Sequence, residues 1–259
     1  MPDTSGPPAA VFAKTRPTAP DAYPAEAAGL TWLAAAGPEA ARIVEVLEVS
    51  PERLVLPRLI PVRSNAPAAA AFGAALAVTH AAGAPAYGAA PDGWTGDGYI
   101  GTQPLPLRPT EHWGTFYADQ RLLPYAEAAT AIGTLRPRGR ILVDRVVERL
   151  RAGEFDDERP PARIHGDLWA GNVIFTETGV VLIDPAAHGG HGLTDLAMLH
   201  LFGAPELATI SNAYADAADL PTDWTDLIGL HQLHPLLVHA VSHGASYGTE
   251  AEAVAARYA

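Results

Sequence analysis

Hydrophobic and polar positions along the chain separate a short strand-forming first part from a longer helix-forming remainder. Apolar runs bounded by turn residues predict strands at Ala9–Lys14, Ala41–Ser50 and Arg53–Leu59. An Ala-rich segment between the first two predicts a helix over Ala25–Gly37, which Gly37 and Pro38 would end. The proline-rich stretch Pro57–Pro67 predicts a hinge after the last strand.

The remainder is dominated by helical periodicity, with helices predicted over Ala68–Gly83, Thr115–Gly133, Arg140–Gly153 and from Thr194 to the end. Residues 84–114, rich in Gly, Pro, Trp and Tyr, predict a long irregular segment. Val173–Asp184 predicts a β-hairpin with its turn near Thr178–Gly179. We therefore predict a two-lobed α+β chain, with a small strand-rich lobe over residues 1–59 and a larger, mostly helical lobe over residues 60–259.

Composition limits the functions that this fold could serve. The 259 residues are 48% hydrophobic, which is enough for one large or two modest cores. A net charge of −12 without a Lys/Arg cluster argues against nucleic acid or an anionic membrane as partner. The absence of cysteine excludes disulfides, thiolate metal sites and cysteine nucleophiles. No apolar run reaches the ~20 residues of a membrane span and the start lacks a signal-peptide pattern, so we expect a cytoplasmic protein.

A group of polar residues flanks the predicted hairpin. His165, Asp167 and Asn172 precede it, and Asp184 follows it. Phosphoryl transfer from ATP requires positioned phosphates and Mg²⁺, an ion that prefers hard oxygen ligands. The order predicts Asn172 and Asp184 as Mg²⁺ ligands and Asp167 as the group that orients, or takes the proton from, the attacking hydroxyl. His165 is expected to brace the loop by hydrogen bonding.

Three residues elsewhere fit the same chemistry. Lys14 ends the first predicted strand and Glu26 begins the following helix, as in the Lys–Glu pair with which kinases hold phosphates. Asp195, at the start of a predicted helix, could cap that helix and hold loop N–H groups. Each residue alone also has an ordinary structural explanation, such as the preference of Glu for helix N-termini. It is the joint spacing that favours a kinase.

The stretch HGDLWAGNVIF, followed by IDPA and GHGLTDLAMLHLFG, resembles the fructosamine kinases (ketosamine-3-kinases), a branch of the protein-kinase-like fold near the aminoglycoside phosphotransferases. The resemblance covers about residues 9–250 and includes DGYIGTQP, HWGTFYADQRLLP and LHQLHPLLVHAVSHGASYG. It implies a bilobal protein-kinase-like fold. It also implies phosphorylation by ATP and Mg²⁺ of a sugar hydroxyl, typically the 3-hydroxyl, on a ketosamine carried by a small amine or a protein.

The resemblance further implies roles for single residues. Lys14 and Glu26 would clamp the phosphates, and the backbone around Leu56 and Arg58 would bind adenine. His191 would brace a loop. The acceptor pocket would use Asp97, Tyr99, Trp113, Phe116 and Trp169, with ordinary core packing as an equal alternative for the aromatic residues.

Two departures from the family pattern qualify this expectation. Only 13 residues precede Lys14, where the family has a Gly-rich strand–loop–strand over the phosphates, so DTSGPPAA would be at most a remnant and the N-terminal lobe would be shortened. Gly98 replaces the family's Asn, and Gln103–Pro109 departs from its Gln/Asn-bearing sequence. A kinase of another hydroxylated substrate, such as an aminoglycoside, or a catalytically silent relative therefore stays an alternative.

Overall fold

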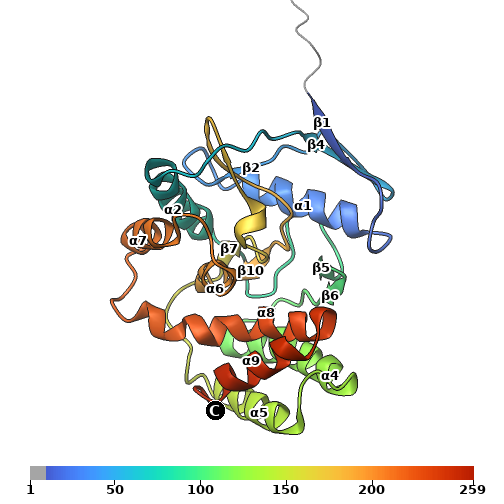
Figure 1. Cartoon of the computed structure of the whole chain (residues 1–259), viewed down its shortest axis with the longest axis vertical. Coiled ribbons are helices and arrows are strands. Elements are labelled where there is room, and N and C mark those ends of the chain that lie inside the picture. The colour runs from blue at the N-terminus through green and yellow to red at the C-terminus, as the bar shows by residue number, and fades with distance from the viewer. Residues whose placement is uncertain (1–9) are drawn as a thin grey trace, which may run out of the picture.

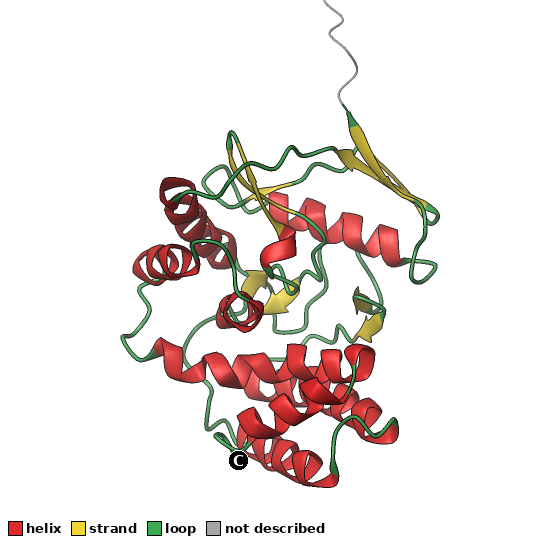
Figure 2. Cartoon of the chain, viewed as in Figure 1, coloured by secondary structure: helices red, strands yellow, loops and turns green. Residues whose placement is uncertain are grey.

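The computed structural model of the protein describes residues 10–259, so that the predicted remnant DTSGPPAA, except its last residue, and the predicted strand start at Ala9 lie outside the described residues. Most strands lie in the upper half of Figures 1 and 2, and helices fill the lower half. The strands are β1 (Val11–Lys14), β2 (Arg42–Ile43), β3 (Glu48–Ser50), β4 (Arg53–Pro57), β5 (Gly98–Ile100), β6 (Gln103–Leu105), β7 (Ala162–Ile164), β8 (Val173–Thr176), β9 (Gly179–Leu182) and β10 (His188–Gly190).

Helices make up a larger share of the described chain than strands do. The α-helices are α1 (Ala22–Ala34), α2 (Ala66–Ala81), α3 (Trp113–Phe116), α4 (Leu123–Ala131), α5 (Pro137–Arg151), α6 (Leu193–Phe202), α7 (Leu207–Ala217), α8 (Ile228–His243) and α9 (Ala245–Ala255). Short turns of 3₁₀-helix cover Ala170–Asn172 and Trp224–Leu227, and a π-helical turn, η1, covers Tyr117–Leu122. No helix in the described range is long and apolar enough to cross a membrane.

The first sheet carries the first of the predicted site residues. β1 and β3 flank β4 in antiparallel pairs, with Lys14 opposite Leu54 at the end of β1. The buried side chains of Leu54 and Leu56 share a core cluster with Tyr23 and Leu30 of α1. The predicted helix therefore packs on the sheet, and it begins and ends three residues before the predicted bounds.

The predicted single strand over Ala41–Ser50 is wrong, because the structure has two strands there in two different sheets. β2 pairs in parallel with β9 of the hairpin, whereas β3 pairs with β4. The backbone between them changes partner: Val44 N–H donates to the Leu182 carbonyl, and Leu47 N–H donates to the Val55 carbonyl. This short segment thereby connects the first sheet to the hairpin that precedes Asp184.

Residues 84–114 are also more regular than predicted. β5 and β6 form an antiparallel hairpin within this segment, closed at Gly101, whose φ of 57° favours glycine. The hairpin lies between α1 and the helices of the larger lobe (Figure 1). It is therefore placed to form one wall of the space between the two lobes.

The β8–β9 hairpin is anchored by its apolar face. Phe175 and Leu182 are buried in a cluster with Phe72 of α2, Leu196 of α6 and Ile210 of α7. A separate cluster of α4, α5, α8 and α9 side chains forms the core of the larger lobe. The hairpin, fixed against α2, α6 and α7, holds the segments before β8 and after β9 in place.

Candidate active site

The loop before β8 is held from beneath by one buried carboxylate. Asp195, 1% exposed near the start of α6, accepts hydrogen bonds from the backbone N–H of His165 (2.7 Å) and Gly166 (2.8 Å). Gly166 has a φ of 80°, and a Cβ there would lie 2.2 Å from the Ala186 carbonyl oxygen, so only glycine fits. Asp195 therefore fixes the backbone directly before Asp167. This is the role of holding loop N–H groups that the sequence predicted for Asp195.

His165 braces the same loop through both ring nitrogens. Its Nδ1 accepts from the Asp167 N–H at 3.2 Å, and its Nε2 lies 2.9 Å from the Ile183 carbonyl. Burial lowers the pKa of His165, which favours the neutral ring with its proton on Nε2, donated to Ile183. The histidine thus ties the loop to the chain directly before Asp184.

A second buried histidine, His80, completes this support, and no local sequence pattern predicted it. His80, in α2, donates from Nε2 to Asp195 at 3.0 Å, and its Nδ1 lies 2.7 Å from the Tyr214 hydroxyl. Burial alone would raise the pKa of Asp195, but its bonds to His80 and to the loop N–H groups lower it. Asp195 is therefore held as an anion, which is the acceptor that the loop requires.

Asp167, Asn172 and Asp184 are brought together at the open end of the hairpin. Asn172 donates from Nδ2 to the Asp167 carbonyl (2.8 Å) and carboxylate (3.3 Å), and to the Asp184 carbonyl (3.3 Å). Asp184 has a φ of 54°, a left-handed conformation that a short polar side chain tolerates. This geometry points the Asp184 carboxylate away from the hairpin towards the first sheet.

Lys14 meets that carboxylate. Its Nζ lies 2.7 Å from Glu26 Oε1 and 2.8 Å from Asp184 Oδ1. Burial alone would lower the pKa of Lys14, but the two carboxylates outweigh it and raise the pKa. The three side chains thus form one ion cluster that joins β1, α1 and the end of β9.

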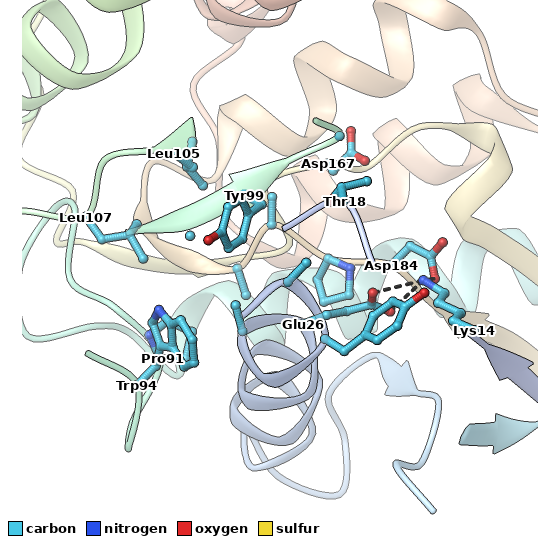
Figure 3. A pocket seen from close by; sticks show the side chains of 18 of the residues that line it. Lys14, Thr18, Glu26, Pro91, Trp94, Tyr99, Leu105, Leu107, Asp167 and Asp184 are labelled. Carbon is cyan, nitrogen blue, oxygen red and sulfur yellow. Dashed lines mark hydrogen bonds and ion pairs between the residues drawn. The ribbon is translucent and has the colours of Figure 1, made fainter. Parts of the chain in front are cut away.

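The Lys14 cluster and Asp167 face a shared cavity of about 300 Å³ (Figure 3). Its lining includes Lys14, Glu26, Asp167, Asp184 and Tyr99, all predicted site residues. Sequence reasoning missed several others, chiefly Arg16 and Thr18 in the segment after β1, Tyr23 in α1, and Trp94 before β5. In the sequence, only the Gly- and Pro-rich segment around Trp94 indicated that this residue could line a site.

One acid that lines the cavity, Asp167, has a pKa well above its ordinary value. Burial raises the pKa of Asp167 to about 7, and the hydrogen bond from Asn172 opposes this only in part. A carboxylate with a pKa near neutrality is a better proton acceptor than an ordinary aspartate, and about half of it is ionised at pH 7. The arrangement can therefore hold a hydroxyl beside a base and an anion beside Lys14.

Several predicted acceptor residues lie elsewhere. Trp113 (3% exposed) and Phe116 (2%) belong to the core, where Trp113 stacks on His231 and Phe116 packs under the Arg121 guanidinium. Neither ring lines the cavity, so of the two alternatives stated for these aromatic residues the structure has core packing. Trp169 is 43% exposed and does not line the cavity.

Asp97 and the predicted adenine segment also lie outside the cavity lining. Asp97 forms an ion pair with Arg108 and accepts from the Leu107 N–H, which closes the segment after β6 onto β5. Leu56 is a buried core residue, and the Arg58 N–H donates to the Ala10 carbonyl at 2.9 Å. The Arg58 N–H is therefore paired with the residue directly before β1, and adenine binding by the backbone around Leu56 and Arg58 stays a prediction.

His191 does not line the cavity and instead supports the loop that carries Asp167. Its Nε2 lies 3.1 Å from Asp157, and its Nδ1 accepts from the Leu193 N–H at 3.1 Å. These bonds hold the start of α6, which carries Asp195. The expected bracing role is consistent with this placement.

The side-chain oxygens of Asp184 and Asn172 are suitable ligands for a magnesium ion. The Asp184 side chain is 39% exposed, and the Asn172 amide oxygen accepts no hydrogen bond from the residues that the structure describes. Within that same range, no group of three or more His, Cys, Asp or Glu side chains is placed to hold a metal. Mg²⁺ commonly takes only one or two protein oxygens and completes its shell with phosphates and water, so Asn172 and Asp184 fit this requirement.

Comparison with known proteins gives a consistent result. A family model described as fructosamine kinase matches residues 6–258. A "Probable ketoamine kinase" of Thermus thermophilus is 33% identical, over 88% of this chain and 79% of its own length. A crystal structure described as "putative fructosamine-3-kinase" from Thermobifida fusca superposes with a TM-score of 0.87 at 42% identity, covering 96% of this chain and 85% of that one.

A more distant solved structure places the fold in a wider group. It is a thermostable mutant of aminoglycoside phosphotransferase APH(4)-Ia in a ternary complex with ADP and hygromycin B. The TM-score is 0.57 at 14% identity, over 91% of this chain and 83% of that one. This similarity confirms the predicted bilobal kinase-like fold. At 14% identity it supports the fold alone. The chain spans only 63%, 59% and 52% of the length of the first three curated relatives that it matches.

Proposed function

This chain belongs to the fructosamine kinase family, and on that premise we propose that it transfers the terminal phosphoryl group of ATP to a hydroxyl of a ketosamine. The observation that carries the proposal is the shared cavity, which Lys14, Asp167 and Asp184 line together. A phosphate-binding cation, a base and a magnesium ligand are the groups that this transfer needs in one place. We expect the 3-hydroxyl of the sugar to be the acceptor, as in the family.

In the proposed reaction Asp167 accepts the proton of the acceptor hydroxyl as its oxygen attacks the γ-phosphorus. The bond from that phosphorus to the β,γ-bridging oxygen breaks, and ADP leaves with the bonding electrons. Lys14 holds the phosphates while Glu26 and Asp184 hold Lys14. Mg²⁺, when bound to Asn172 and Asp184, would neutralise phosphate charge.

The bracing residues contribute by keeping Asp167 in place. Asp195, His80 and His165 fix the loop backbone on either side of Gly166, so Asp167 need not be ordered when the substrates arrive. A base held within hydrogen-bond reach of its substrate contributes about 10²–10⁴-fold to a rate. The buried network therefore supports the proposed role without contacting a substrate.

The proposal is tested by incubating the protein with ATP, MgCl₂ and fructosyl-butylamine and following ADP release and the phosphorylated product by ³¹P NMR. We expect phosphate transfer that requires Mg²⁺ and is absent in Asp167→Asn. A parallel incubation with kanamycin tests the alternative acceptor class. Transfer to the aminoglycoside alone, or nucleotide binding without transfer to any ketosamine, would overturn the proposal.

A further inference from the structure

The cavity beside Asp167 is lined by more carboxylates than cations. Its charged lining residues are Lys14, Arg16, Glu26, Asp167 and Asp184. One cation ends β1 and the other follows it two residues later, whereas the carboxylates come from α1, from the loop before β8 and from the end of β9. A phosphoryl group brings further negative charge into this space. Its transfer therefore depends on each positive charge that can reach it.

Lys14 has few hydrogen-bond donors left for a phosphate. An ammonium group has three N–H bonds. Its Nζ lies 2.7 Å and 2.9 Å from the two Glu26 carboxylate oxygens and 2.8 Å from Asp184 Oδ1. All three donors are thus matched by carboxylate oxygens. If Mg²⁺ drew Asp184 away, Lys14 would gain one donor for the phosphates while Glu26 kept the other two.

Arg16 is the second cation of the lining, and it has no such partner. It forms no ion pair with any residue in the range 10–259, and it is exposed. A guanidinium group stays charged at every pH at which the protein would work, and it presents five N–H donors in one plane. Arg16 is therefore the lining cation whose charge is available to an anion.

The backbone of Arg16 is held in place before any ligand arrives. Its N–H donates to the Tyr23 hydroxyl at 2.9 Å, and Tyr23 is 6% exposed in the cluster that joins α1 to β4. Pro17 follows directly and restricts the backbone of Arg16 to extended conformations. Binding an anion would therefore order only the side chain of Arg16.

The segment that carries Arg16 runs along the path that the phosphoryl group must take. In Figure 3, Thr18 lies between Asp167 and the cluster of Lys14 with Asp184, and all of these residues line the same cavity. Arg16 stands between Lys14 and Thr18 in the chain. On the proposed function, the phosphates lie at the Lys14 end and the acceptor hydroxyl lies at Asp167. The position of Arg16 is thus intermediate between donor and acceptor.

From this geometry we infer that Arg16 is a catalytic residue, whose guanidinium binds the oxygens of the γ-phosphoryl group during its transfer. The inference rests on the proposed function and adds a residue to it. The bond from the acceptor oxygen to phosphorus forms, and the bond from phosphorus to the β,γ-bridging oxygen breaks. The hydroxyl proton passes to Asp167, ADP leaves with the bonding electrons, and Arg16 keeps all its protons. Its planar fork matches two phosphoryl oxygens at once.

Steady-state kinetics of Arg16→Ala with ATP, MgCl₂ and fructosyl-butylamine test the inference. An arginine on a transferring phosphoryl group contributes about 10³–10⁵-fold to kcat in GTP-hydrolysing enzymes, so kcat should fall about 100-fold or more. The KM values for both substrates should change less than about threefold, because the contact strengthens only in the transition state. Arg16→Lys should recover only part of the rate, since an ammonium group lacks the planar fork.

A control and a chemical rescue separate this role from a structural one. Arg53, at the start of β4 in the same sheet, is 47% exposed and does not line the cavity, so Arg53→Ala should keep the wild-type kcat. Guanidinium chloride at concentrations too low to unfold the protein should restore part of the activity of Arg16→Ala. The same addition should restore none of the activity of Asp167→Asn, which lacks the base.

Calorimetry with ADP, MgCl₂ and aluminium fluoride tests the contact without an acceptor, because the planar fluoride complex resembles a phosphoryl group in transfer. We expect the wild-type protein to bind ADP about tenfold or more tightly when aluminium fluoride is present. Arg16→Ala should bind ADP alone within about twofold of wild type and lose most of this gain.

An unchanged kcat in Arg16→Ala would overturn the inference, and so would a rise in the KM for ATP or for the acceptor without a fall in kcat. The same gain from aluminium fluoride in both proteins, or a gain in neither, would overturn it as well. Failure of the wild-type protein to phosphorylate any ketosamine would instead overturn the proposed function. Loss of the aluminium fluoride gain in Arg16→Ala would then still support the assigned contact.

Discussion

Two clusters of polar side chains build the site, one under the loop that carries Asp167 and one in the lining of the cavity, and they differ in their exposure to water. The cluster below the catalytic loop is closed, with Asp195 1% and His80 5% exposed. The cluster above it is open, with side-chain exposures of 18% for Lys14, 15% for Glu26 and 39% for Asp184. The closed cluster bonds mainly to backbone N–H groups and so fixes geometry. The open cluster bonds side chain to side chain, which a phosphate or a metal ion can replace.

Asp167 stands between the two clusters, and its loss should have the largest effect on activity. Asp167→Asn keeps the shape and the hydrogen bond to Asn172 but removes the base, so kcat should fall about 10³-fold. Affinity for Mg-ATP should change less than twofold, because Asp167 acts on the acceptor. Steady-state kinetics and nucleotide calorimetry measure the two quantities, and an unchanged kcat would refute the assignment.

The closed cluster should matter most for stability. Asp195→Asn leaves one oxygen for the N–H groups of His165 and Gly166 and sets an NH₂ group against the other, so the free energy of unfolding should fall by about 3 kcal/mol. Denaturant unfolding measures this change. Asp119→Asn is the matched control, because that carboxylate pairs with Arg151 at the surface, with both side chains at least 40% exposed, and its loss should cost under about 1 kcal/mol. Equal losses in the two variants would contradict the distinction.

The two clusters also differ in how well the sequence predicted them. Lys14, Glu26, Asp167 and Asp184 lie at the ends of strongly patterned strands and helices, where local sequence places a side chain reliably. His80 and Tyr214 lie inside α2 and α7, and the bonds of His80 to Asp195 and of Tyr214 to His80 depend on how these helices pack. Packing partners separated by more than 100 residues leave no local pattern in the chain.

The same distinction explains what the sequence left open at the acceptor side. Trp113 and Phe116 were expected either to contact the substrate or to pack in the core, because aromatic residues suit both, and the packing of α3 places them in the core. Ala41–Ser50 has a continuous strand pattern, yet its two halves pair with strands from distant parts of the chain. The fold class and the charged residues of the cavity were predictable, whereas the presence of Tyr23 and Trp94 in its lining required the structure.

The open cluster should respond through ligand affinity. Asp184→Asn removes the carboxylate proposed for Mg²⁺ and one partner of Lys14, so the affinity for Mg-ATP should fall at least tenfold. The affinity for ATP measured with EDTA should fall much less. This pattern is the opposite of that expected for Asp167→Asn, and identical behaviour of the two variants would show that the roles are wrongly divided.

The raised pKa of Asp167 predicts a pH dependence of both activity and stability. The acid must be ionised to accept a proton, so kcat/KM for the acceptor should rise towards a plateau with an apparent pKa near 7, about tenfold below the plateau at pH 6. The pKa is raised from its ordinary 3.8, so the folded protein holds a proton that the unfolded chain releases. This contribution to stability is full below pH 3.8 and is lost as pH rises through about 7. The difference in unfolding free energy between wild type and Asp167→Asn should follow the same course, and a difference independent of pH would refute the shift.

The smallest effect is expected for Glu26, and it separates the two properties of the open cluster. In Glu26→Gln, Lys14 keeps its 2.8 Å contact with Asp184, so the unfolding free energy should change by less than about 1 kcal/mol. The freed ammonium group would nevertheless be drawn more closely to Asp184, and the phosphates would have to compete with that carboxylate. We therefore expect a several-fold rise in the KM for ATP with kcat changed less than twofold, measured beside Glu45→Gln as a surface control. A stability loss as large as that of Asp195→Asn would show that the open cluster holds the fold together in the same way as the closed one.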